Sequence, residues 1–308
     1  MTRLIAMTGT CILLFSILAM TVTAHAQDAT PTSAFEGLDL PTLDITVTGT
    51  GYEGIPTEID AGRYLITATA TEATAKFGGG NVSFVQPVGA TAEEYLQAVA
   101  PPPAEATPSA DGGEDAPPPF VYESTYAGGA FISPSQPVHM VIDLHPGEWI
   151  AWGGDATAPW SPVIFEATGE MPAELAEPVV SATITMDEHS FAVSDGEMVA
   201  GSQIVRIENT GAQMHHVSAG RIIDGIDRDD VLAVLQADMT GTPAVVDFNP
   251  EEDFQTVFFS GNQSGGTTMW LAVDLQTGPH VMLCFVMDPE TGLPHALLGM
   301  VEVIDVEP

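Results

Sequence analysis

The sequence has very few basic residues. Of its 308 residues, 6 are Lys or Arg and 42 are Asp or Glu, and Lys76 is the single lysine. A surface this acidic repels nucleic acid and anionic lipid, so we expect no nucleic-acid partner. An acidic surface suits a basic partner or a saline or acidic habitat, or it only keeps the protein soluble. The net charge alone does not distinguish these explanations.

Long hydrophobic runs are also missing, apart from one near the N-terminus. Arg3 precedes the apolar run "CILLFSILAM", and "AHA" at residues 24–26 has the small-x-small form of a signal-peptidase site. This run is too short and too early for a membrane span. Residues 1–26 are therefore predicted to be a signal peptide, with the mature chain soluble in the periplasm or outside the cell. Its removal would leave 5 basic residues against 42 acidic ones, a net charge of −37.

Cysteine occurs only at Cys11 and Cys284, and Cys11 would leave with the signal peptide. Cys284 then has no partner for an internal disulfide, although an exported protein enters an oxidising compartment. Three explanations remain for the lone thiol: a metal ligand, an intermolecular bridge, or an inert buried side chain.

The motifs of several enzyme classes are absent. The chain contains no GxSxG, no HExxH and no phosphate-binding glycine loop. The His-x-His pairs usual in multicopper oxidases and nitrite reductases are missing as well. We therefore expect no enzyme.

The chain contains an internal duplication. The segment "ITVTGTGYEGIPTEIDAGRYLI" (45–66) aligns without a gap on "ITMDEHSFAVSDGEMVAGSQIV" (184–205), and "VIDLHPGEWIAW" (141–152) aligns on "AVDLQTGPHVML" (272–283). A short helical pattern follows the first segment in each half, at 91–100 and at 226–237, with acids in its first turn. A long unit that occurs twice indicates two similar domains.

Short Val-, Ile- and Thr-rich runs separated by Gly, Pro and Asn predict mostly strands. We expect an all-β protein of two tandem Greek-key β-sandwich domains, each with one short helix. A Pro- and acid-rich surface loop is expected at 100–119. The predicted boundaries are a flexible lead-in at 27–40, domains at 41–168 and 181–308, and a linker at 169–180.

The second domain carries the residues with ligand chemistry. "ENTGAQMHHVSAG" supplies His215 and His216, and "MLCFVMDPETGLPHALLGM" supplies Cys284, His295 and Met300. A thiolate, two imidazoles and a weak axial thioether form the ligand set of a mononuclear blue-copper site. Taken singly, each of these residues could simply fill the core or lie in a turn or loop. Their occurrence together in the order His, Cys, His, Met favours a copper site.

These motifs resemble those of the cupredoxins. In that family the first histidine follows a strand that ends in an Asn/Gly turn, the cysteine ends a late strand, and the second histidine and the methionine lie on the next loop. "PHALLGM" looks like the corresponding loop of plastocyanins and copper nitrite reductases. The resemblance covers 181–308 in ligand pattern and 41–168 only in scaffold. It implies one type 1 copper per chain, held by His215, Cys284, His295 and Met300.

Neighbouring residues on a strand point to opposite faces, so only one of His215 and His216 can face the metal. The family pattern places the ligand first, which favours His215, with His216 behind it or facing solvent. No role is assigned to the remaining histidines of the mature chain, which are His139, His145, His189 and His280.

The aligned positions in the first domain carry no ligands. Lys76 takes the place of His215, Gly153 that of Cys284, and Trp160 lies near that of His295. We expect this domain to be free of metal and to act as a support, spacer or docking surface.

The resemblance implies one-electron transfer with a redox protein. If the ring edge of His295 reaches the surface, Leu293, Leu297 and Leu298 would surround the exit point, and Asp288 and Glu290 could steer a basic partner. The alternatives are a copper carrier or storage protein and a metal-free binding or structural module.

Overall fold

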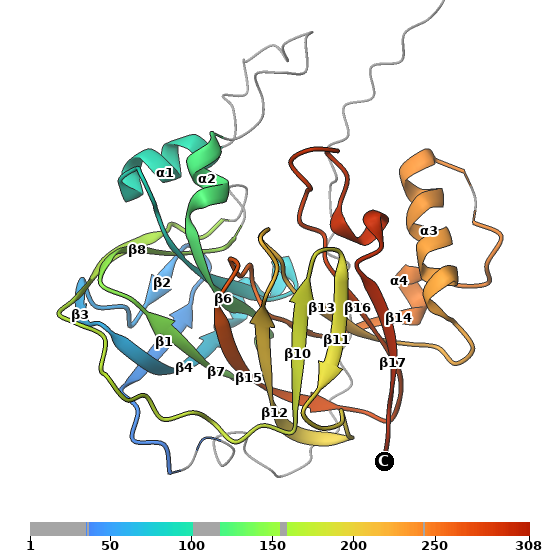
Figure 1. Ribbon diagram of the computed structural model, residues 1–308, viewed down its shortest axis with the longest axis horizontal. Coiled ribbons are helices and arrows are strands. Elements are labelled where there is room, and N and C mark those ends of the chain that lie inside the picture. The colour runs from blue at the N-terminus through green and yellow to red at the C-terminus, as the bar shows by residue number, and fades with distance from the viewer. Residues whose placement is uncertain (1–34, 36, 101–117, 155–158, 243) are drawn as a thin grey trace, which may run out of the picture.

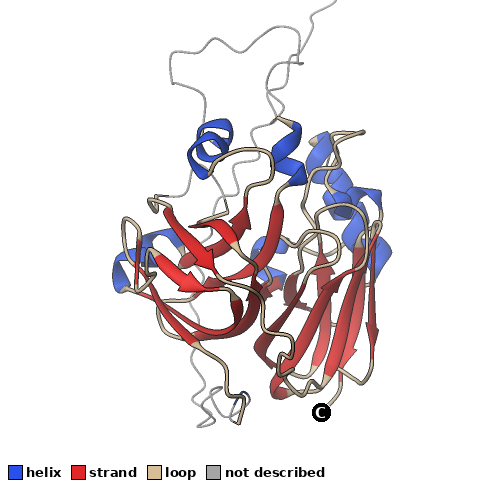
Figure 2. Cartoon of the chain, turned by 60° about the vertical axis from the view of Figure 1, so that its left-hand side comes forward, coloured by secondary structure: helices blue, strands red, loops and turns tan. Residues whose placement is uncertain are grey.

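The computed structural model describes residues 35, 37–100, 118–154, 159–242 and 244–308 (Figure 1). The predicted signal peptide, most of the lead-in and most of the predicted 100–119 loop lie outside these ranges. Strands dominate, and the few helices lie at the periphery (Figure 2). No helix in the described ranges is both long enough and apolar enough to span a membrane.

One large sheet runs through both halves of the chain. Its eight strands have the order β11-β10-β12-β15-β7-β4-β1-β2. These strands are β1 (Thr42–Val47), β2 (Tyr52–Glu53), β4 (Gly62–Ala70), β7 (Val138–Leu144), β10 (Ala182–Asp187), β11 (Ser190–Ser194), β12 (Gly201–Asn209) and β15 (Thr268–Leu275). The order is symmetric about the β15–β7 pair, because each strand of one half has its counterpart at the same distance on the other side.

Two smaller sheets complete the architecture, one in each half. Their orders are β3-β9-β8-β5-β6 and β14-β13-β16-β17. These strands are β3 (Glu58–Asp60), β5 (Gly80–Gln86), β6 (Thr125–Ile132), β8 (Gly147–Trp152), β9 (Val163–Thr168), β13 (Ser218–Ile222), β14 (Phe254–Phe259), β16 (Gly278–Leu283) and β17 (Val301–Val306). Side chains from the large sheet and from both smaller sheets form the core, as Ile66, Trp149 and Met282 illustrate. The predicted all-β class with two sandwiches is confirmed.

Helices occupy the connections. They are η2 (Glu72–Phe77), α1 (Ala92–Val99), α2 (Pro119–Glu123), α3 (Arg228–Thr240), α4 (Pro250–Asp253) and η3 (His295–Leu298). The expected helices at 91–100 and 226–237 are α1 and α3, and Thr91 and Asp227 begin them with capping boxes. Each half also has a second short helix, α2 or α4, which starts with a proline at the position where the missing N–H costs nothing.

The duplication seen in the sequence is preserved in strand register. Leu43 pairs with Ile66 in the parallel β1–β4 ladder, and the aligned residues Ala182 and Val205 pair in the parallel β10–β12 ladder. The same chain offset thus places the same partners opposite each other in both halves. The domain boundaries themselves stay a prediction.

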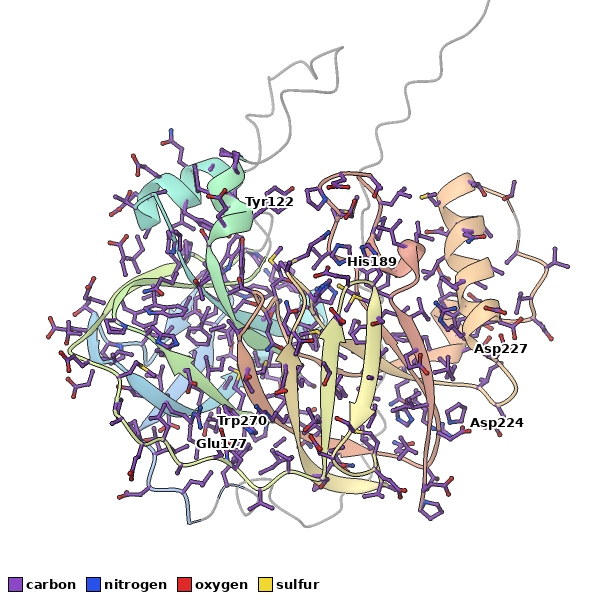
Figure 3. All side chains as sticks on the ribbon, viewed as in Figure 1. Tyr122, Glu177, His189, Asp224, Asp227 and Trp270 are labelled. Carbon is purple, nitrogen blue, oxygen red and sulfur yellow. The ribbon has the colours of Figure 1, made fainter. Side chains whose placement is uncertain are left out.

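The two halves join at the centre of the large sheet. There Trp270 of β15 pairs with Val141 of β7, and the guanidinium of Arg63 lies 4.2 Å from the Trp270 ring centroid (Figure 3). Arg63 also binds both carboxylate oxygens of Asp143, at 2.7 and 2.9 Å. Phe35, within the lead-in predicted to be flexible, is buried in this cluster, so that end of the lead-in belongs to the fold.

A serine makes a second junction between the halves. Ser264 Oγ donates to the carbonyl of Ser124 and accepts from the backbone N–H of Tyr126, both at 2.9 Å. We expect Ser264→Ala to lower the free energy of unfolding by about 1–3 kcal/mol, because backbone groups at the junction lose their partner. Denaturation in urea measures this. Ser202→Ala, at an exposed position of β12, should leave the stability unchanged, and equal effects of the two would contradict the assignment.

Candidate metal centre

Four segments bring the predicted ligands to one end of the second sandwich. His215 lies between β12 and β13, Cys284 follows β16, His295 begins η3, and Met300 directly precedes β17. All four side chains have no exposed surface. This is the end at which the β10–β11 hairpin carries His189, at its upper tip in Figure 3.

Two nitrogens and one sulfur converge at this end. His215 Nδ1 and His295 Nδ1 are 3.0 Å apart, and Cys284 Sγ lies 3.9 Å from the first and 3.6 Å from the second. Around one ion bound at about 2.0–2.1 Å from nitrogen and about 2.3 Å from sulfur, neighbouring ligand atoms lie roughly 3–4 Å apart. The three side chains therefore fit a single first-row metal ion without rearrangement.

Met300 is held against the same residues by its backbone. Its N–H donates to the carbonyl of His295 at 2.9 Å, and its carbonyl accepts from Cys284 N–H at 3.3 Å. The Met300 side chain is buried in the same core cluster as Cys284. The short η3 turn between His295 and Met300 thus ties the backbone of Met300 to those of His295 and Cys284.

Burial sets the protonation of all three groups. It lowers the pKa of His215 to about 3, and the pKa of His295 to about 4, with neighbouring histidines adding to both shifts. Burial also raises the pKa of Cys284 to about 11, against hydrogen bonds from the backbones of His216 and Val286 that favour the thiolate. At neutral pH the rings are therefore neutral, as metal binding requires, and a bound cation would deprotonate the thiol.

His216 points away from this centre and is buried rather than facing solvent. Its Nδ1–H donates to Asn262 Oδ1 at 3.0 Å, and its Nε2 accepts from Phe285 N–H at 3.0 Å. Both ring nitrogens are thereby used. His216 fixes the backbone just after Cys284, a role that the sequence pattern did not suggest.

A short segment at 262–264 links the centre to the first half of the chain. The backbones of His215 and Gln263 exchange two hydrogen bonds, at 3.0 and 2.7 Å, and Ser264 N–H donates to the carbonyl of Tyr126. Asn209 Nδ2 donates to the carbonyls of Gln213 and Gln263, both at 2.8 Å. The first half therefore braces the segment that holds His215.

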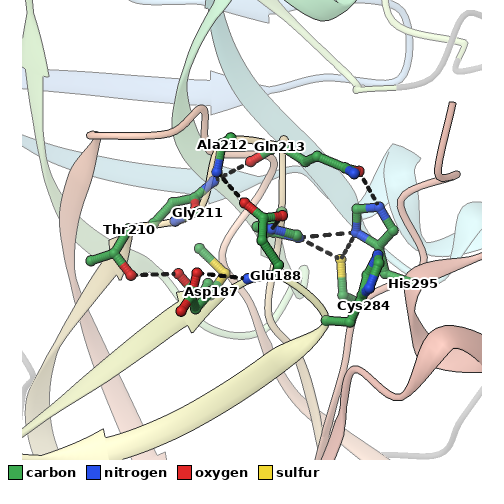
Figure 4. A network of polar contacts seen from close by, with 12 residues as sticks. Asp187, Glu188, Thr210, Gly211, Ala212, Gln213, Cys284 and His295 are labelled. Carbon is green, nitrogen blue, oxygen red and sulfur yellow. Dashed lines mark hydrogen bonds and ion pairs between the residues drawn. The ribbon is translucent and has the colours of Figure 1, made fainter. Parts of the chain in front are cut away.

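The outer edge of His295 does not reach the surface. Its Nε2 lies 2.9 Å from Gln213 Oε1, and the His189 ring packs edge-on at a centroid distance of 5.0 Å (Figure 4 shows the Gln213 contact). The sequence-based idea that the ring edge of His295 reaches the surface, as the exit point for electrons, is therefore wrong. Asp288 is buried as well, so it cannot meet a partner. His189, for which the sequence predicted no role, is partly exposed and covers His295.

His215 also has its outer nitrogen enclosed. Nε2 is buried, and Glu188 Oε2 lies 3.8 Å from it. Glu188 is itself fixed by the backbone N–H of Ala212 (Figure 4). Gly211 leaves room for the ring, because a Cβ there would lie 3.1 Å from His215 Nε2 and 2.8 Å from Glu188 Oε1.

Among the described residues, two groups have ligand atoms close enough to share a metal. One is His215, Cys284 and His295, and the other is His189, Asp288 and His295. The second group shares His295 with the first, and its Asp288 is occupied by other hydrogen bonds. We interpret it as the layer that encloses the first group.

The matching position in the first half contains an aromatic pair. Trp160, buried, meets Phe77 edge-on with ring centroids 5.9 Å apart. Asn81 Nδ2 donates to the carbonyl of Gly153, at the position aligned with Cys284. Lys76 is exposed, with Nζ 4.7 Å from the Phe77 ring centroid. Two bulky rings therefore stand at or near the positions that align with His216 and His295.

No protein-family model matches the chain, and no curated protein matches it. Among solved structures, the chain is similar to a reduced auracyanin from Roseiflexus castenholzii, at 20% identity over 41% of this chain and 95% of that chain (TM-score 0.26). It is also similar to a multicopper oxidase, at 12% identity over 86% and 88% (TM-score 0.21), and to a copper nitrite reductase from Nitrosomonas europaea, at 11% over 86% and 93% (TM-score 0.21).

These three structures differ in how much of the chain they match. The shorter one covers less than half of the chain, and the longer two extend over both halves. They include enzymes as well as an auracyanin. At such low identities and TM-scores they do not decide a function, which has to come from the side chains described above.

Proposed function

We propose that the protein is an exported blue-copper protein that binds one type 1 copper ion per chain and carries single electrons between redox partners. The proposed ligands are His215, Cys284, His295 and Met300. One observation carries the proposal: two imidazole Nδ1 atoms and one buried Sγ meet at separations of 3.0–3.9 Å.

The chemistry of this ligand set favours copper among the first-row metals. A thiolate and a thioether stabilise Cu(I), and imidazole accepts both Cu(I) and Cu(II). Copper held there would supply one-electron exchange. The chain keeps the ligands in one arrangement, because each lies in the core and the backbones of Cys284, His295 and Met300 are hydrogen-bonded to one another. Little structural change would then accompany a change in charge.

Burial of the site supports electron transfer over catalysis. All four proposed ligands are inaccessible to solvent, so no open position faces a substrate. Both potential metal groups in the described part of the chain use His295, which leaves no independent cluster there for a second, catalytic copper. This supports a non-enzymatic role.

We propose a basic redox protein as the partner. Asp187 and Glu188, in the turn beside the site, and Glu290, in the loop between Cys284 and His295, are exposed. Their charges would speed the approach of a cationic surface, and the encounters would weaken as salt is added. Met287, exposed on the same loop, offers apolar contact beside them.

Copper titration tests the function. Adding Cu(II) to the mature chain should give one equivalent of bound copper and an intense thiolate-to-copper band in the visible spectrum. Ascorbate should bleach the band and ferricyanide should restore it. Copper uptake without the band would point to a carrier or storage protein, and no uptake would point to a metal-free module. Either result would overturn the proposal.

A further inference from the structure

We propose that Asp288 and Gln213 form a positioning relay that holds His295 in one tautomer, with the proton on Nε2 and the lone pair on Nδ1. The relay deepens the proposed function and rests on it in one respect, that Nδ1 is the atom offered to the metal. The tautomer itself is a property of the metal-free chain, so it can be tested separately.

The relay begins at a carboxylate whose position is fixed by its own loop. Asp288 Oδ1 accepts hydrogen bonds from Thr291 N–H and Thr291 Oγ1, both at 2.7 Å, and from Glu290 N–H at 3.1 Å. Only 4% of the residue is exposed. These bonds aim the second oxygen, Oδ2, toward Gln213, and they hold the pKa of Asp288 down at about 2, the Thr291 bonds having the largest effect. Oδ2 is thus purely an acceptor.

Because Asp288 Oδ2 can only accept a hydrogen bond, the side-chain amide of Gln213 can adopt only one of its two orientations. Its Nε2 lies 3.1 Å from Asp288 Oδ2, and its Oε1 lies 2.9 Å from His295 Nε2. Turning the amide over would set two acceptors against each other at Asp288. The amide group therefore presents its carbonyl oxygen to His295, and the carboxylate determines this choice.

A carbonyl oxygen can only accept, so His295 must donate from Nε2. The neutral ring then has its lone pair on Nδ1, which lies 3.6 Å from Cys284 Sγ. His215 Nδ1 lies 3.0 Å from His295 Nδ1, the atom that carries this lone pair. In the metal-free protein His215 is therefore expected to be the donor, with its proton on Nδ1. The two proposed ligands carry their protons on different nitrogens.

The loop between Cys284 and His295 folds around the relay. The loop turns back at Asp288, whose backbone N–H donates to the carbonyl of Leu293 at 2.9 Å. Met287 and Pro294 form a bridge just outside this turn. These contacts build the Asp288 turn and, through Gln213, tie the loop to the segment before His215.

The tautomer can be read directly by ¹⁵N NMR of the metal-free, reduced protein labelled at histidine. The wild type should show His295 with a protonated Nε2 and a bare Nδ1. Gln213→Leu and Asp288→Asn should each raise the population with the proton on Nδ1. Asp305→Asn removes a carboxylate from an exposed position of β17 and should change nothing. Dispersed amide spectra of the variants would show that they fold.

Copper affinity gives a second readout. Loss of the relay should weaken binding by about 10- to 100-fold, the usual effect of removing an outer partner of a metal-bound histidine. The double variant should lose no more than either single one, because both act through the same hydrogen bond. A wild-type His295 with its proton on Nδ1, a tautomer indifferent to both substitutions, or additive losses of affinity would each overturn the relay. Failure to bind copper with the tautomer shift intact would instead overturn the proposed function alone.

Discussion

Replacing Cys284 by serine should abolish the visible charge-transfer band completely. The band requires a thiolate bound to copper, and Cys284 is the only described cysteine, with Sγ 3.6 and 3.9 Å from the two imidazole nitrogens. A serine hydroxyl has nearly the same shape but is a hard, weakly acidic ligand that does not stabilise Cu(I). The measurement is the visible spectrum after Cu(II) addition, together with the amount of copper retained.

A matched control separates loss of the ligand from damage to the core. Met282 is buried two residues earlier on β16 and is 1% exposed. Met282→Leu conserves side-chain volume, so it should cost less than about 1.5 kcal/mol and keep the band. If Cys284→Ser retained an intense band, the thiol would not be a ligand, and the site as proposed here would be wrong.

His215→Ala and His216→Ala should differ sharply in copper binding. The first removes a proposed ligand, so its loss of affinity should exceed the 10- to 100-fold typical of outer partners. The second keeps all four ligands and should stay within that range. Its main effect should be on folding, since the hydrogen bonds to Asn262 and Phe285 disappear and the free energy of unfolding should fall by about 1–3 kcal/mol.

Two measurements on the same samples distinguish these effects. Competition with a chelator gives the copper affinity, and denaturation of the metal-free protein gives the stability. Within the described part of the chain, the His215 ring makes its side-chain polar contacts inside the site and with Glu188. The metal-free stability of His215→Ala should therefore change less than its copper affinity. Equal affinity losses for the two variants would reject the assignment of His215 over His216.

Much of the fold could be predicted because its signals are local or repeated. The β strands follow from Val- and Thr-rich runs, and the acids at Glu93 and Asp229 mark the first turns of α1 and α3. The proposed ligands could be chosen because thiol, imidazole and thioether occur in a recognised order. The alignment of the halves also places Trp160 near the position of His295. That the first half binds no metal stays a prediction.

What the sequence could not predict depends on contacts between distant residues. Neither segment alone contains a sequence signal for the pairing of Trp270 with Val141 between the halves. Nor does any spacing indicate that Gln213 reaches Asp288, or that His189 covers His295. Glutamine and aspartate in loops are common, and their roles here arise only when the 213 and 288 loops meet. His216 was ambiguous for the same reason, because its partner Asn262 lies 46 residues away.

The shared eight-stranded sheet would give a metal bound in the second half an influence on the first half as well. Detaching β7 from β15 would uncover unpaired backbone at Met140, Val141 and Ile142 and expose the Trp270 ring. Because of this linkage, any ion that binds only the folded second half also opposes unfolding of the first. The first half, in which no ligands are proposed, would thus gain thermal stability from a cation that it does not contact.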